Sequence, residues 1–420
     1  MLSFARLYLR PRTIHPKAFM TDFNAEATAL RANLNSLQKK LQKPVVLQDL
    51  DASISLPMSD QVVRARALWN SSVVARSNKH ARRSQGVCVV GGAKAIRRIW
   101  RDYGIQPNVV YVPNTEPAVL PWCLEESLPS FIVRCPPVEV KKHLLSAEYS
   151  DGYAAEFPWY PSQLSPAVAL FASDDTAGEG FTATERSTTA SMPCDERGTK
   201  LIRSMLVLVG LRIPSNVGML LRAAVDLSYD SVLLVNCVDP FQEKVVRASE
   251  GAAYSPRLQL FEMADTTSCV SFLNNIALQH HLLPLLAVPS QEVQQAFDVA
   301  KQFHTHNARQ RQRARDGTAA SSTPAGTIGP MLILGSESEG LRGLDNGVWT
   351  SPYQLLTLPL PNAIVDSHNV TVSGSILLNL FRPDAEAHFM ECATITGECL
   401  ANEGEDIPLW AKSREVPQLS

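Results

Sequence analysis

Short apolar runs alternate with amphipathic stretches along residues 204–381. The apolar runs predict buried strands, and apolar positions spaced three and four apart predict the helices that cover them. The expected strands are 204–211, 231–235, 258–261, 282–288 and 331–334, and the expected helices are 215–227, 243–249 and 267–279. This alternation of strand and helix is typical of a largely parallel α/β sheet.

A similar alternation on a smaller scale, over residues 81–160, predicts a second α/β domain. The helix expected at 93–103 places its apolar side chains on one face and its cations on the other. The cations are Lys94, Arg97, Arg98 and Arg101. A stripe of one sign favours contact with RNA phosphates, although an ordinary solvated helix face is an equally open alternative.

Other segments lack this periodicity and divide the chain. We expect an N-terminal helical extension over 21–80, a polar linker over 161–200, a catalytic domain over 201–382 and an acidic tail over 383–420. Residues 301–330 interrupt the catalytic pattern, and we interpret them as an inserted basic surface loop. Its candidate RNA-binding residues are Arg309, Arg311 and Arg313.

Residues 1–20 hold Arg6, Arg10, Arg12 and Lys17 but no acidic residue. Basic residues interspersed with apolar ones, without a long apolar core, are typical of an organelle transit peptide. We therefore expect a location in the mitochondrial matrix, with an ordinary basic tail as the alternative.

The composition narrows the possible partners. The formal net charge of the 420 residues is only −2, so an RNA surface has to come from local clustering. The eight cysteines form no CxxC pair, and neither His280–His281 nor His304 and His306 have ligand partners at metal spacing, so no metal is expected. No apolar run approaches the roughly 18 residues that span a bilayer, so no membrane partner is expected.

Three short motifs carry the candidate chemistry. Asn216, Gly218 and Arg222 fall in one predicted helix, where Gly218 leaves room for a ligand beside the guanidinium one turn away. The run from Gly335 to Leu341 follows a buried strand, and its two carboxylates argue against a phosphate loop. In the third motif, after Leu358-Pro-Leu-Pro, Ser367 is the expected helix cap, and Asn369 is expected in the first helical turn.

Together these runs, N-x-G-x-x-x-R-x-A, G-S-E-x-x-G-L and L-P-L-P with S-x-N-V-T-V, resemble the SpoU (TrmH-type) branch of the SPOUT RNA methyltransferases. The resemblance is good over 204–381. It is weaker over 82–157, which is similar to the ribosomal-protein-like RNA-binding domain that often precedes the catalytic one. It implies a trefoil-knotted α/β domain that binds S-adenosylmethionine, works as a homodimer or heterodimer, and methylates a ribose 2′-hydroxyl.

Carried over by motif, the resemblance assigns residues to two roles. The implied cofactor-binding residues are Gly335, Ser336, Glu337, Gly340, Leu358, Leu360, Ser367 and Asn369. The implied catalytic residues are Arg222, Asn216, Glu337 and Asn369. His368 stands where the family usually has Leu.

The expected substrate is mitochondrial ribosomal RNA, with tRNA as an open alternative. A different class of function also stays open, namely a non-catalytic ribosome-assembly factor that uses the knotted fold to dock RNA or assembly intermediates.

Overall fold

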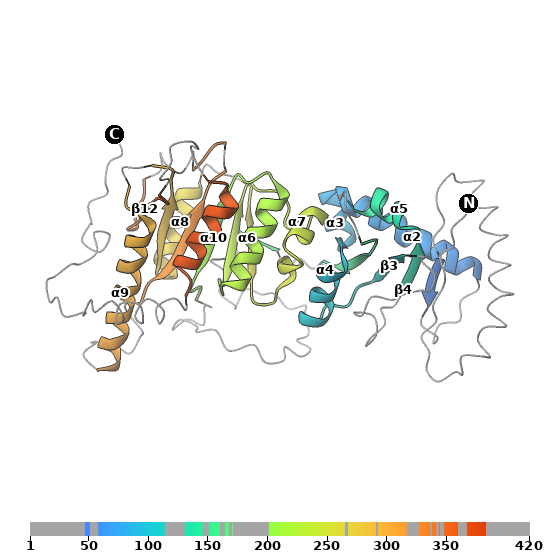
Figure 1. Cartoon of the computed structure of the whole chain (residues 1–420), viewed down its shortest axis with the longest axis horizontal. Coiled ribbons are helices and arrows are strands. Elements are labelled where there is room, and N and C mark those ends of the chain that lie inside the picture. The colour runs from blue at the N-terminus through green and yellow to red at the C-terminus, as the bar shows by residue number, and fades with distance from the viewer. Residues whose placement is uncertain are drawn as a thin grey trace. The chain divides into compact units, whose positions relative to one another are not determined.

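The computed structural model describes residues 47–50, 58–113, 131–145, 151–159, 164–167, 170, 201–264, 268–290, 293–316, 327–336, 338–341, 344, 348–359 and 368–383 (Figure 1). The chain forms two compact units. Unit 1 comprises Met1–Pro161 and Asp239–Ser255, and unit 2 comprises Ser162–Val238 and Pro256–Ser420.

The described part of unit 1 is a five-stranded sheet in the order β1-β4-β3-β5-β2. The strands are β1 (Leu47–Leu50), β2 (Val87–Gly91), β3 (Val109–Pro113), β4 (Phe131–Cys135) and β5 (Ala154–Pro158). The helices are α2 (Met58–Ser77), α3 (Lys79–Gln85), α4 (Ala93–Arg97), the π-helix η1 (Arg98–Asp102), α5 (Pro137–Glu139) and the π-helix η3 (Val140–Leu144). Helix α2 packs on the sheet, with the Trp69 ring edge-on to Tyr111 at 5.5 Å. Strand β1 and α2, both within the expected extension 21–80, thus belong to the same unit as residues 81–160.

Residues 239–255 leave unit 2 after Val238 and fold with unit 1. They contain α7 (Glu243–Ala248) and the 3₁₀ turn η7 (Ala252–Tyr254). A buried ion pair joins Arg82 of α3 to Asp239, and the Phe241 ring packs edge-on against Tyr254 at 5.2 Å. The sequence order alone places this segment with the catalytic domain, because strands of that domain flank it on both sides.

The described part of unit 2 is a seven-stranded sheet in the order β12-β10-β11-β7-β8-β9-β6, and every pairing in it is parallel. The strands are β6 (Leu164–Pro166), β7 (Met205–Val209), β8 (Ser231–Val235), β9 (Gln259–Met263), β10 (Leu282–Ala287), β11 (Gly329–Leu334) and β12 (Gln354–Leu356). The helices are α6 (Pro214–Asp226), α8 (Cys269–Gln279), α9 (Ala296–Arg315) and α10 (Val370–Leu380). The predicted parallel α/β fold is therefore confirmed.

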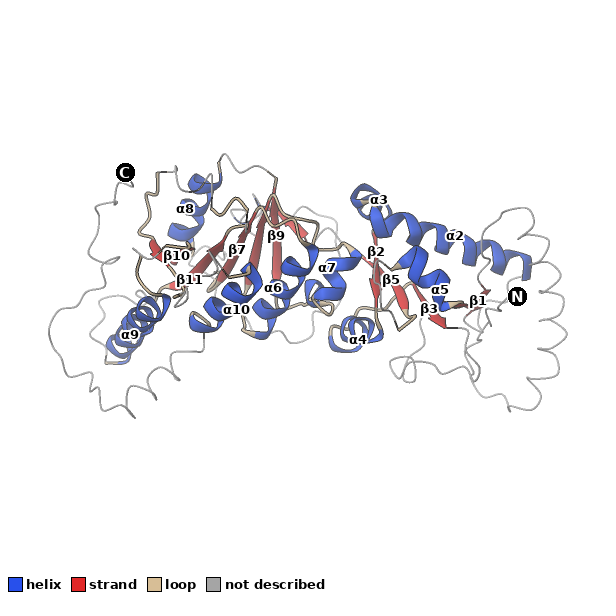
Figure 2. Ribbon diagram, turned by 45° about the horizontal axis from the view of Figure 1, so that its top comes forward, coloured by secondary structure: helices blue, strands red, loops and turns tan. Residues whose placement is uncertain are grey.

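Alternate residues of the central strands pack against helices on opposite faces of this sheet. Ile333 belongs to the core cluster that α8 completes, whereas Leu334 faces α10. Figure 2 shows α6 and α10 side by side. A Cβ at Gly374 of α10 would lie 2.5 Å from the Leu220 side chain and 2.7 Å from that of Leu334. The absence of a side chain at Gly374 therefore lets α10 approach α6 and β11 closely.

Helix α9 corrects the interpretation of residues 301–330 as an inserted loop. Residues 301–315 are the later part of a 20-residue helix that begins at Ala296. Its inner face is anchored by buried Phe303, which contacts Phe381, and by buried His304, whose Nε2 lies 2.8 Å from the Leu380 carbonyl oxygen. Among the described helices, none combines the length and apolar character needed to cross a bilayer.

Candidate active site

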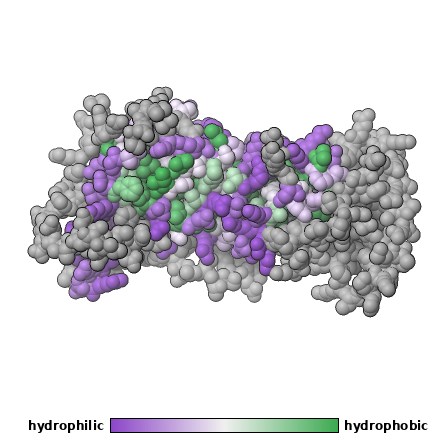
Figure 3. All heavy atoms as spheres, viewed as in Figure 1, coloured by the Kyte–Doolittle hydropathy of each residue, from purple (hydrophilic) through white to green (hydrophobic). Residues whose placement is uncertain are grey.

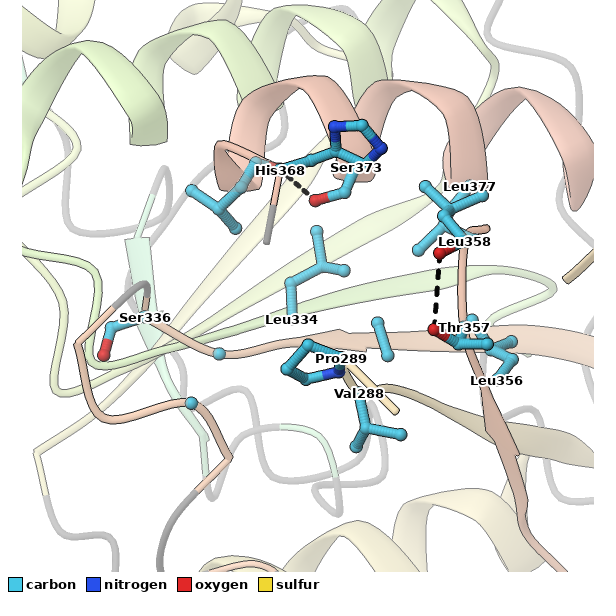
Figure 4. Close-up of a pocket in the computed structure, with 14 residues that line it drawn as sticks. Val288, Pro289, Leu334, Ser336, Leu356, Thr357, Leu358, His368, Ser373 and Leu377 are labelled. Carbon is cyan, nitrogen blue, oxygen red and sulfur yellow. Dashed lines mark hydrogen bonds between the residues drawn. The ribbon is translucent and has the colours of Figure 1, made fainter. Parts of the chain in front are cut away.

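A cavity opens at the carboxyl ends of three neighbouring parallel strands, β10, β11 and β12, and the first turns of α10 close it (Figure 4). This edge of a parallel sheet is where α/β proteins bind ligands, because loops diverge there and leave backbone groups unpaired. The lining residues are Ala287, Val288, Pro289, Leu334, Gly335, Ser336, Gly340, Leu356, Thr357, Leu358, His368, Val370, Ser373 and Leu377.

The loop after β11 is a tight turn that only glycine permits at its first position. A Cβ on Gly335 would overlap the Gly340 carbonyl group and lie 2.8 Å from the Leu341 nitrogen. The turn is closed by the Gly340 amide, which donates to the Ser336 carbonyl oxygen at 2.8 Å. The Glu339 amide donates to the Ser336 hydroxyl at 3.0 Å. Gly335, Ser336 and Gly340 all line the cavity, whereas Glu337 lies outside the described residues.

The loop after β12 forms a second wall of the cavity. Backbone bonds anchor it to the start of α9: the Thr357 amide donates to the Gln294 carbonyl oxygen at 3.1 Å, and the Ala296 amide donates to the Thr357 carbonyl oxygen at 2.9 Å. Leu358 lines the cavity. Leu360 and Ser367 lie outside the described residues.

The third wall is the N-terminal end of α10, and its cap is not the expected residue. Asn369 is the N-cap, and its Oδ1 accepts from the Thr371 amide at 2.9 Å. The expectation that Ser367 caps the helix and Asn369 lies inside it is therefore wrong. His368, immediately before the cap, lines the cavity (Figure 4). Its place in the sequence, beside Asn369 in the third motif, was the signal that could have marked His368 as a site residue.

The described cavity wall contains no carboxylate, lysine or arginine side chain. Its side chains are aliphatic apart from three hydroxyls and the His368 imidazole. Such a wall suits a ligand with apolar or aromatic parts and hydroxyl groups, and it offers no fixed positive charge to a polyphosphate. Within the described part of the chain, no cluster of His, Cys, Asp or Glu could hold a metal ion.

The first motif contributes differently from the other two. Asn216 is buried in the first turn of α6, where its Oδ1 accepts from the Thr371 hydroxyl at 3.1 Å. It therefore ties α6 to α10 beneath the Asn369 cap. Arg222 is partly exposed, and its Nε lies 3.7 Å from Oδ2 of Asp226. Neither Asn216 nor Arg222 lines the cavity of its own chain.

The expected RNA-binding residues fall on two separate helices. Lys94, Arg97 and Arg101 are exposed, while Arg98 is half-buried, 3.7 Å from Glu250. The opposite side of that segment, with Ile96, Ile99 and Trp100, is buried as predicted. The spacing changes midway because residues 98–102 form a π-helix. Arg309, Arg311 and Arg313 are exposed on α9.

The comparisons with known proteins come from sequence and from structure. Residues 203–379 match the SpoU rRNA Methylase family, while no curated protein matches the chain. A putative RNA methyltransferase of the TrmH family from Porphyromonas gingivalis is 18% identical, with 78% of this chain and 99% of that one covered and a TM-score of 0.46. An RNA 2′-O ribose methyltransferase is 20% identical over 75% of this chain and 94% of that one, with a TM-score of 0.48. An AdoMet-bound rRNA methyltransferase from Sinorhizobium meliloti is 13% identical over 75% and 94%, with a TM-score of 0.47. Residues 203–379 therefore carry the sequence features of the SpoU rRNA Methylase family.

Proposed function

We propose that the protein transfers a methyl group from S-adenosylmethionine to a ribose 2′-hydroxyl of RNA. The observation that carries this proposal is the convergence of two motif loops, at Gly335–Gly340 and at Leu358, on one cavity at the carboxyl edge of a SpoU-family domain. The two loops follow different strands, β11 and β12, yet both line the same cavity.

The cavity fits the cofactor in its chemistry. Gly335, Ser336, Gly340 and Leu358 would hold it through backbone groups, and the aliphatic wall suits the faces of an adenine ring. When bound, S-adenosylmethionine supplies an electrophilic methyl group on a sulfonium. The described wall carries no fixed cation that would repel the sulfonium charge.

The reaction requires the ribose oxygen to approach in line with the bond that breaks, so positioning is the main task of the protein. Arg222 is the proposed positioning group. Its guanidinium would orient the ribose-phosphate unit and stabilise negative charge that develops on the oxygen. Asn369, which lies between the cavity-lining residues His368 and Val370, and Glu337 are proposed to help hold the nucleotide.

Because Arg222 does not line the cavity of its own chain, we propose that a second copy, or a related chain, completes the site. Met219 of α6 is 41% exposed, and Val372 of α10 is 51% exposed. Figure 3 shows an apolar patch over α10. Arg222 lies one turn after Met219 and so beside this patch. A subunit that covers the patch would bring its own cavity close to Arg222, and the trefoil knot is proposed for each subunit.

The proposed substrate is mitochondrial ribosomal RNA, with tRNA as the alternative. Support for RNA contact in unit 1 comes from the exposed cations Lys94, Arg97 and Arg101 on one helical segment. Support for the mitochondrial matrix comes from the basic, acid-free residues 1–20.

The test combines cofactor binding with methyl transfer. Calorimetry with S-adenosylmethionine should give one binding event per chain, and radiolabelled methyl should appear on ribosomal RNA from cells that lack the protein. Arg222→Ala should abolish transfer and leave cofactor binding intact, while Arg257→Ala, which removes an exposed cation elsewhere in unit 2, should change neither. Mapping of ribose methylation in organellar RNA with and without the protein would identify the nucleotide.

The rival function is a non-catalytic assembly factor that docks RNA or ribosome intermediates. It is favoured by the position of Arg222 outside the cavity of the single chain. Absence of both cofactor heat and methyl transfer, in a protein that still binds ribosomal RNA, would establish the rival.

A further inference from the structure

Helix α9 has an anchored first part and a projecting second part. Its first part packs through Val299, Ala300 and Phe303, all buried. The last anchor is buried Asn307, whose Nδ2 donates to the Ile328 carbonyl oxygen at 2.9 Å and whose Oδ1 accepts from the Ile328 amide at 2.9 Å. No described residue of the helix beyond Asn307 is buried, and Figures 1 and 2 show this end running past the sheet.

The projecting end is strongly basic. It carries four arginines, all exposed: Arg309, Arg311, Arg313 and Arg315. The only acidic residue in the helix is Asp298, in its first turn. The positions of the cations near the helix C-terminus suit the helix dipole. Like charges four residues apart nevertheless repel each other, so the four arginines add little to the stability of the unbound protein.

The arginines divide between two opposite faces of the helix. Successive members of the series are two residues apart, or about 200° around the axis. Arg309 and Arg313 therefore share one face, and Arg311 and Arg315 share the other. A flat anionic surface could contact only one of these pairs at a time, whereas a groove between two phosphate walls contacts both.

This basic end lies far from the methyl-transfer cavity. The helix begins beside the cavity, where the Ala296 amide donates to the carbonyl oxygen of Thr357. It ends beyond the opposite edge of the sheet, because Asn307 bonds Ile328 immediately before β11 begins. At about 1.5 Å per residue, Arg309 is about 20 Å along the axis from Ala296. The arginines therefore cannot hold the reacting nucleotide of their own chain.

We propose that the projecting end of α9 is a second RNA-binding site, which inserts into a groove of a folded, double-stranded region and contacts phosphates on both walls. No aromatic residue lies between Asn307 and Arg315 on which single-stranded bases could stack. RNA duplexes are recognised mainly through shape and backbone, which matches a site built from cations alone. The inference rests on the proposed RNA substrate and adds that this substrate must be large and structured, since it reaches both cavity and helix end.

The test compares two matched double variants, Arg309→Gln/Arg313→Gln and Arg311→Gln/Arg315→Gln. Arginine and glutamine have similar helix propensities, so both variants should keep the parent's helix content by circular dichroism. The probe is a hairpin RNA with a stem of about 16 base pairs, titrated at several salt concentrations. Each variant should lower the slope of log affinity against log salt by about 2, because each arginine removed leaves about one phosphate without its neutralising cation. The control Arg257→Gln/Lys301→Gln removes two exposed cations of unit 2 that lie outside the projecting end, Lys301 being in the anchored first part of α9, and should leave the slope unchanged.

Each other outcome overturns a stated part of the proposal. An effect of only one pair would exclude insertion between two walls, and an effect of neither would exclude the site. If poly-glutamate bound the parent as tightly as the hairpin and depended on the same arginines, the partner would be an acidic protein. Cofactor binding and methyl transfer are measured separately. A protein that binds the hairpin through both pairs without transferring methyl would refute the proposed activity and leave this site standing.

Discussion

The loop after β11 allows a sharp test of the cavity, because its two glycines are required for different reasons. Gly335 has no room for a side chain: a Cβ would overlap the Gly340 carbonyl group and lie 2.8 Å from the Leu341 nitrogen, where ordinary contacts begin at 3.4 Å. Gly340 has ample room, since nothing lies within 4 Å of the position that a Cβ would take, but its φ is +60°. Alanine at either position adds the same single methyl group.

The magnitudes differ because the obstacles differ. In Gly335→Ala the facing backbone must retreat by roughly 1 Å, which breaks the bond from the Gly340 amide to Ser336 and costs about 1 kcal/mol in the loop. The retreat also moves cavity-lining backbone, and a displacement of about 1 Å at a site can cost about 100-fold in rate. In Gly340→Ala the cost is the left-handed conformation alone, about 1–2 kcal/mol, with the loop still able to close.

Calorimetric titration with S-adenosylmethionine and thermal unfolding distinguish the two variants. Gly335→Ala should weaken cofactor binding much more than Gly340→Ala, at a similar and small loss of stability. Equal cofactor affinity of Gly335→Ala and the parent would refute the assignment of this loop to the cofactor. A large fall in melting temperature in Gly335→Ala alone would mean that the loop stabilises the folded domain rather than binding the cofactor.

Three further substitutions test the framework. Asn274→Ala removes the acceptor shared by the Thr350 and Ser351 amides and should cost about 1–3 kcal/mol in denaturant unfolding, whereas exposed Asn275→Ala should cost almost nothing. Burial raises the pKa of the Glu156 carboxyl above its usual value of about 4.5. The contribution of Glu156 to stability is therefore complete below pH 4.5 and is lost as the pH rises through the pKa of the folded state. In Glu156→Gln, this pH dependence of the free energy of unfolding should disappear. Asn369→Ala removes the α10 cap and should cost about 1 kcal/mol in urea unfolding, and methyl transfer should disappear as well.

Much of unit 2 could be predicted because its local signals agree with one another. The apolar runs are buried on both faces, as parallel strands require, and glycine directly follows two of them, at Gly210 after β7 and at Gly335 after β11. The loops proposed to hold the cofactor follow from the same rule, since ligand sites form where such strands end. Only the family resemblance could connect Arg222 with these loops, because its side chain does not line the cavity of the single chain.

Helix α9 shows why some of the fold was not predictable from periodicity. Its inner face beyond Phe303 is made by His304 and Asn307, which are polar residues that a hydrophobic pattern assigns to solvent. They are buried because each bonds a backbone group, His304 at Leu380 and Asn307 at Ile328. Burial also lowers the pKa of His304, which favours the neutral imidazole, whereas its hydrogen bond to the Leu380 carbonyl group acts in the opposite direction. A polar inner face can be recognised only when its partners are known.

His304 and Asn307 fix α9 to the rest of unit 2, so that the helix holds the proposed RNA-binding arginines at a set distance from the cavity. At one end, Ala296 is bonded to Thr357 in the cavity wall, and at the other the arginines project beyond the sheet. Substitutions at the arginines should therefore weaken the binding of large RNA without changing cofactor affinity. Substitutions at Gly335 should weaken cofactor binding without changing RNA affinity. His304→Leu would loosen the packing that joins α9 to the end of α10, since the Leu380 carbonyl group loses its partner. If α9 acts as a spacer, that single change should impair RNA affinity even though it leaves every cation in place.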